Sequence, residues 1–98
     1  MTINAVPKST TSRKLALAAL RRWRTSSDFS DQIVAELFGH SGLSRADRAF
    51  ALELFYGSLR NLSLLDFWIA QLRSAPIDIS SRDLLRLGLY QILLLETP

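Results

Sequence analysis

The chain has 98 residues, of which 48% are hydrophobic and 21% are charged, which is typical of one folded globular domain rather than of a disordered segment. It contains no cysteine and a single histidine, His40, which excludes a thiolate nucleophile, a disulfide and a cysteine- or histidine-rich metal site within these residues. The formal net charge of +3 is unevenly distributed, because residues 1–24 hold six basic residues and no acidic one, whereas residues 25–98 hold six basic and nine acidic residues.

The start of the chain is predicted to be a flexible polar tail over residues 1–11, followed by a helix over residues 12–25 with Ser12 as its N-cap. At about 100° per residue, apolar side chains gather on one face of this helix, as expected for a helix that packs on a core. That face consists of Leu15, Ala16, Ala19, Leu20 and Trp23. The rest of this helix carries five of the twelve basic side chains of the chain.

A short second helix is predicted over residues 31–39, after a turn rich in serine and aspartate. The glycines of the segment GHSG (39–42) suit the C-terminal end of this helix. His40 lies in that segment, and we expect it to be a capping or partly buried residue rather than the centre of a Ser/His/Asp triad. Nothing in this part of the sequence indicates catalysis.

The segment from 45 to 60 is predicted to be the central, buried helix of the fold, because its helical wheel is apolar on nearly all sides. Ser44 and Asp47 have a spacing close to that of a capping box and place the start of the helix at residue 45. The charged side chains of a buried helix need partners. Arg48 is therefore predicted to tether a neighbouring segment, and Glu53 and Arg60 are predicted to form an ion pair or a hydrogen-bonded tether.

Two further helices are predicted, over residues 62–74 and 81–95. Pro76 ends the first of them, and Ser80 with Asp83 repeats the capping-box spacing at the start of the second. Gly88 is predicted to permit a close approach of this last helix to the central one. No strand-like alternation occurs, so the predicted fold is an all-α bundle of five helices.

Three stretches, in this order and spacing, resemble the NusB-like helical domain: DRAFALELFYGSLRN (47–61), LLDFWIAQL (64–72) and LLRLGLYQILLLETP (84–98). That domain occurs alone, as the NusB antitermination protein. It also forms the N-terminal RNA-binding part of the RsmB (Fmu/Sun) family of ribosomal RNA cytosine-C5 methyltransferases, to which the pairing of YGSLR with LGLYQ is closer. The resemblance covers residues 12–98 and implies a NusB-like domain that lacks the family's last helices.

The resemblance implies a non-catalytic role for these residues. A cytosine-C5 transferase adds a thiolate to the base, and this chain has neither a cysteine nor an S-adenosylmethionine-binding domain. We therefore expect no enzymatic activity, no cofactor and no metal ion from these residues. Their expected role is to recruit or position ribosomal RNA for a methyltransferase.

The helix over residues 12–25 is the predicted RNA-binding region, because NusB-type proteins are thought to bind RNA through a basic N-terminal helix. Arginine and lysine also suit phosphates by themselves, and arginine can stack on an unpaired base. The predicted RNA-binding residues are Arg13, Lys14, Arg21, Arg22 and Arg24. Judged from charge alone, a solvated basic face without a ligand is slightly favoured, and it is the resemblance that favours RNA.

A second function is a protein-interaction or dimerisation module of the NusB-like antitermination type, which acts in the regulation of transcription. A partner protein or a second copy of the chain would then cover apolar surface. A helix-turn-helix DNA-binding domain is disfavoured, because its recognition helix should be polar and exposed. The apolar run over residues 84–95 is too short to span a bilayer and no signal peptide is recognisable, so a cytoplasmic location is predicted.

Overall fold

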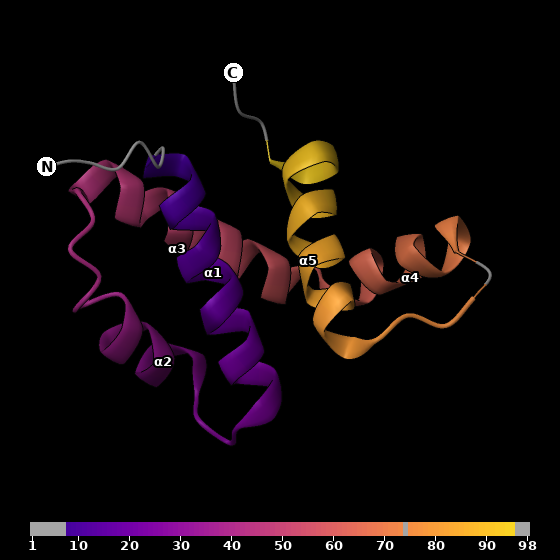
Figure 1. Ribbon diagram of the computed structural model, residues 1–98, viewed down its shortest axis with the longest axis horizontal. Helices are drawn as coiled ribbons and strands as arrows, with labels where there is room; N and C mark the ends of the chain where they lie inside the picture. Colours follow the sequence, from indigo (N-terminus) through magenta and orange to yellow (C-terminus); the bar gives the residue numbers. More distant parts are fainter. Residues whose placement is uncertain (1–7, 74, 96–98) are drawn as a thin grey trace, which may run out of the picture.

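The computed structural model describes residues 8–73 and 75–95, and within these ranges all of its regular secondary structure is helical, with no strand (Figure 1). This confirms the all-α class and the five helices expected from the sequence. The elements in chain order are α1 (Lys8–Thr25), α2 (Ser30–Leu37), α3 (Arg45–Arg60), α4 (Leu62–Leu72), α5 (Ile79–Leu89) and a π-helical turn, η1 (Tyr90–Leu94). None of the helices in the described ranges is long and apolar enough to cross a membrane.

The core lies mainly between α1 and α3, which cross each other, while α2 and α5 lie on either side of α1 (Figure 1). The apolar face predicted for α1 is buried there, and its short alanine side chains allow the two helix axes to approach closely. The fully buried side chains at this crossing are Ala16, Ala19 and Leu20 of α1 and Ala51, Leu54 and Phe55 of α3. Trp23 and Trp68 are half-buried and pack against this core.

The central helix α3 has the predicted start and the predicted position. The Ser44 hydroxyl oxygen accepts from the Asp47 amide at 3.1 Å and donates to the Asp47 carboxylate at 2.9 Å, which closes the first turn. From residue 45 onward the helix contacts α1, α4, α5 and η1. Burial on several sides explains why its helical wheel has no single polar face.

Two predicted helix starts are wrong. Helix α1 begins at Lys8, so Ser12 lies inside it rather than at its N-cap; its hydroxyl donates to the Asp47 carbonyl at 2.9 Å and is fully buried. Residues 8–11 are thus helical and not part of a tail, while residues 1–7 lie outside the described ranges. Helix α5 begins after Asp78, not after Ser80, because the Asp78 carboxylate accepts from both the amide (3.0 Å) and the hydroxyl (2.7 Å) of Ser81. These bonds lower the pKa of Asp78.

The predicted helix over residues 81–95 is interrupted near its end. Helix α5 stops at Leu89, and the chain widens into η1, where the Leu95 amide donates to the Tyr90 carbonyl at 2.9 Å. Gly88 does not touch α3, since a Cβ atom at this position would meet nothing within 4 Å. The close approach occurs instead at Gly57 of α3, where a Cβ atom would overlap the ring of Tyr90.

Candidate nucleic-acid interface

Arg22, in the C-terminal half of α1, is held by two carboxylates. Its Nε and one of its terminal nitrogens donate to Asp28 at 3.1 and 2.8 Å, and the same terminal nitrogen donates to Glu36 of α2. The bonds to Glu36 and then to Asp28 raise the pKa of Arg22 above its ordinary value. This side chain therefore ties α1 to α2, and acidic groups of the fold compensate its charge.

Arg24 belongs to a buried ion-pair network that joins α1, α5 and α4. Its guanidinium lies 2.8 to 2.9 Å from one oxygen of Asp83, whose side chain is fully buried. Arg86 donates to the other oxygen of Asp83 at 3.1 Å and makes two bonds of 2.8 Å to Asp66. Asp66 is the main cause of the raised pKa of Arg86, and the nearby Asp83 adds to it. A buried carboxylate without a partner is costly, so this network fixes the position of Arg24.

Sequence reasoning missed the other three members of this network. Asp83 was assigned to a helix cap, and Asp66 and Arg86 were not assigned a role. The sequence does contain a signal for Asp66 and Arg86. Each is the single charged residue of an apolar segment, LLDFW (64–68) for Asp66 and LLRLGL (84–89) for Arg86. A lone charge in such a helix indicates a buried partner.

Three further cations of α1, Arg13, Lys14 and Arg21, form what we call the basic surface of α1. Arg13 and Lys14 are exposed and Arg21 is half-buried, two turns from Lys14 on the same side of the helix. Within residues 11–73 and 75–95, no carboxylate lies within ion-pair distance of these three. Arg13 donates to the neutral amide of Gln91 at 2.7 Å and lies 5.6 Å from the ring centre of Phe50, so no described residue neutralises its charge.

A groove of about 210 Å³ runs between α1 and α5, next to the basic surface of α1. Its walls are mostly apolar, and its rim carries two of the three cations. The lining residues are Arg13, Lys14, Leu17, Leu84, Leu87, Gly88 and Gln91. The space left by the missing side chain of Gly88 belongs to this groove.

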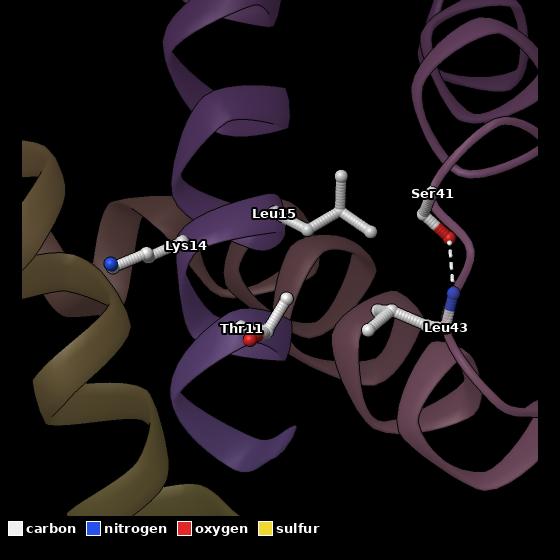
Figure 2. Close-up of a pocket in the computed structure, with 5 residues that line it drawn as sticks. All are labelled: Thr11, Lys14, Leu15, Ser41 and Leu43. Atoms are coloured by element: carbon white, nitrogen blue, oxygen red, sulfur yellow. Dashed lines mark hydrogen bonds between the residues drawn. The ribbon is translucent and has the colours of Figure 1, made fainter. Parts of the chain in front are cut away.

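A second hollow, of about 280 Å³, lies between α1 and the loop that precedes α3 (Figure 2). It is lined by Thr11, Lys14, Leu15, Ser41 and Leu43, and the Leu43 amide donates to the Ser41 hydroxyl at 3.3 Å. Figure 2 shows that the Lys14 side chain points away from Leu15 and Leu43, toward the other side of α1. The ammonium group therefore belongs with the groove between α1 and α5.

The predicted tethers on α3 have different surroundings. Arg60 donates to Glu53 at 3.3 Å, and the Tyr90 hydroxyl donates to the same carboxylate oxygen, which links α3 to η1. Burial and then Glu53 raise the pKa of Tyr90 to about 12. Arg48 is half-buried, and no hydrogen bond or ion pair of its side chain joins it to another described residue, so its tethering role stays a prediction.

His40 is exposed, and its Nδ1 lies 2.9 Å from the Glu36 carbonyl oxygen at the C-terminal end of α2. This is the capping position expected from the sequence. Within the described part of the chain, no group of three or more histidine, cysteine, aspartate or glutamate side chains could hold a metal ion.

Residues 10–98 of the chain match the NusB family. The chain belongs to this family. Members of the NusB family bind RNA and protein partners, and the NusB domain is itself non-catalytic. The basic surface of α1 is therefore this chain's candidate RNA interface.

Three curated relatives illustrate where such domains occur. "Putative methyltransferase Rv1407" of Mycobacterium tuberculosis is 37% identical over 83% of this chain and 18% of its own length. "Probable ribosomal RNA small subunit methyltransferase B" is 37% identical over 86% of the chain and 20% of its own length in Synechocystis, and 32% identical over 91% and 20% in Bacillus subtilis. The chain thus spans about a fifth of the length of these relatives. No solved structure gives a significant match.

Proposed function

We propose that this NusB-family domain binds ribosomal RNA for a small-subunit ribosomal RNA methyltransferase, with Arg13, Lys14 and Arg21 as its phosphate-binding cations. The observation that carries the proposal is the contrast along α1, where no carboxylate of the described residues pairs with these three side chains while Arg22 and Arg24 are paired. The names of the relatives suggest the kind of RNA. A methyltransferase would supply the reaction, because this chain has no cysteine.

Binding through these cations is electrostatic in origin. Three phosphate contacts to single-stranded RNA correspond to a slope of about −2 for the logarithm of affinity against the logarithm of salt concentration. Such contacts position the RNA backbone and read no sequence by themselves. We therefore expect the isolated domain to bind related RNA fragments with similar affinity.

The test is a titration of labelled ribosomal RNA fragments with the wild type and two variants, Lys14→Glu and Lys14→Glu/Arg21→Glu. The single variant changes only an exposed side chain, so the fold should be kept; the double variant should abolish binding. The matched control is Arg73→Glu, which makes the same charge change at an exposed arginine at the end of α4, far from α1 (Figure 1). The proposal requires that Arg73→Glu weakens binding far less than Lys14→Glu does. Equal affinities of the Lys14 variants and the wild type would contradict the proposal and would mean that the basic surface of α1 is solvated without binding RNA.

A second candidate function, contact with a second copy of the chain, is favoured by exposed apolar side chains on α4 and at the start of α5. They are Leu64, Phe67, Leu72 and Ile79, and α4 lies at the edge of the bundle (Figure 1). Apolar patches of this kind mark interaction surfaces. Sedimentation at micromolar concentration should show dimers that the Phe67→Glu variant loses, whereas a monomer throughout that range argues against this function.

A further inference from the structure

We propose that the groove between α1 and α5 binds one unstacked base of a single-stranded RNA whose phosphates contact the basic surface of α1. This inference rests on the proposed function and adds to it a site that reads a base rather than a phosphate. Its evidence is the shape of the groove, the hydrogen bonds that Gln91 leaves unused and the charges at the rim.

The groove has the size and lining expected for a single ring system. Its volume of about 210 Å³ lies below the range of roughly 300–1,000 Å³ that holds whole small-molecule ligands, so it suits one part of a longer molecule. Leu17 and Leu87 offer apolar contact, and Leu84 is an exposed leucine beside them with 53% of its surface accessible. Gly88 leaves this space empty, since even a Cβ atom there would touch nothing.

Gln91 places an amide at the groove with hydrogen-bonding capacity to spare. Its Oε1 accepts from Arg13 at 2.7 Å, and its Nε2 donates to the Leu87 carbonyl at 3.3 Å. A primary amide has two N–H donors and two acceptor lone pairs, so one of each remains for a ligand. The edges of nucleobases carry donors and acceptors side by side, which an amide can pair with.

The charges at the rim select a nucleotide over an uncharged ligand. Arg13 and Lys14 stand beside an apolar groove, so the preferred occupant has a flat apolar ring joined to an anionic group. Unpaired nucleotides of RNA have this chemistry, and their bases can leave the stack to enter a protein site. The bases of a duplex are stacked and paired and should not enter the groove.

The test fills the groove without changing any charge. Gly88→Leu places a side chain in the space, Gly88→Ala is the matched control, and Leu84→Ala removes an exposed wall residue and should not affect folding. The probes are a labelled single-stranded ribosomal RNA fragment and an abasic ribose-phosphate strand of the same length. Gly88→Leu should weaken binding of the RNA about tenfold, Leu84→Ala about threefold and Gly88→Ala less than about twofold, the scale of one lost base contact. All three should bind the abasic strand as the wild type does.

Either of two outcomes would overturn the base site. One is unchanged RNA binding by both Gly88→Leu and Leu84→Ala, and the other is an equal loss of affinity for the RNA and for the abasic strand. The Lys14→Glu variant separates this failure from failure of the proposed function. If Lys14→Glu weakens binding of both strands while the groove variants weaken binding of neither strand, RNA binding by the basic surface of α1 is supported and the base site is contradicted. If Lys14→Glu also changes nothing, both proposals fail.

Discussion

The two halves of α1 carry similar numbers of positive charges but use them differently. In the C-terminal half, two of the three cations, Arg22 and Arg24, bind carboxylates of α2, α5 and the loop before α2, whereas Arg21 has no ion-pair partner among the described residues. In the N-terminal half, Arg13 and Lys14 meet only neutral groups or solvent among the described residues. The comparison teaches that the number of basic residues in a segment does not give the charge that its surface offers to a ligand. The reason is that acidic residues elsewhere in the fold can neutralise the basic side chains at one end of the segment.

The largest expected effect lies in the network that holds Arg24. Replacing Asp83 by alanine leaves two largely buried arginine side chains, Arg24 and Arg86, without their shared partner. Breaking a buried pair in this way costs about 3–5 kcal/mol of the free energy of unfolding. Chemical denaturation of Asp83→Ala measures the loss. A loss no larger than that of an exposed substitution such as Arg73→Ala would show that the C-terminal half of α1 is not anchored as described.

A similar contrast separates the two sides of the last helical segment, one packed on α3 and the other open to the groove beside the basic surface of α1. Gly57→Ala places a methyl group against the ring of Tyr90 and should destabilise the fold by about 1–3 kcal/mol. Gly88→Ala meets nothing and should stabilise α5 by about 0.5–1 kcal/mol, because alanine favours helix over glycine. Thermal melts of the two variants should therefore shift in opposite directions. Shifts of the same sign would mean that one of the two sides is packed differently.

A smaller effect should appear in alkaline solution. The pKa of Tyr90 is raised to about 12 by burial and then by Glu53, so the fold favours the neutral phenol. The stabilisation is complete below the ordinary pKa of tyrosine, about 10, and is lost as the pH rises through 12. The Tyr90→Phe variant keeps the ring that fills the space at Gly57 but has no phenol to titrate. Denaturation midpoints measured between pH 9 and 12 should fall more steeply for the wild type, and parallel curves would contradict the raised pKa.

Much of the fold could be predicted because local patterns and tertiary packing agree. The start of α3 followed from Ser44 and Asp47, whose side chains satisfy backbone groups of their own first turn. The start of α5 did not follow, because Asp78 with Ser81 and Ser80 with Asp83 both have plausible capping spacing. Tertiary packing decided between the two pairs, because Arg24 of α1 and Arg86 of the next turn of α5 bind the Asp83 carboxylate, which is therefore not a cap.

The ion pairs of the α1 cations could not be predicted from the sequence, for a related reason. A helical wheel shows on which side a cation lies, but not whether a carboxylate distant in sequence lies opposite it. Arg22 and Asp28 are six residues apart, whereas Arg24 and Asp83 are separated by 59 residues. The groove likewise depends on Gly88 and Gln91 lying beside Lys14, which no local pattern reveals.

The most direct test of the account is the salt dependence of RNA binding in two variants that each remove one charge from α1, Lys14→Gln and Arg22→Gln. Each phosphate contact to a single strand contributes about −0.7 to the slope of log affinity against log salt concentration. The account predicts that Lys14→Gln makes the slope less negative by about that amount, while Arg22→Gln leaves it unchanged, because Arg22 binds Asp28 and Glu36. Equal changes in the two variants, or a change in Arg22→Gln alone, would contradict the division of the α1 cations into carboxylate-bound ones and RNA-binding ones.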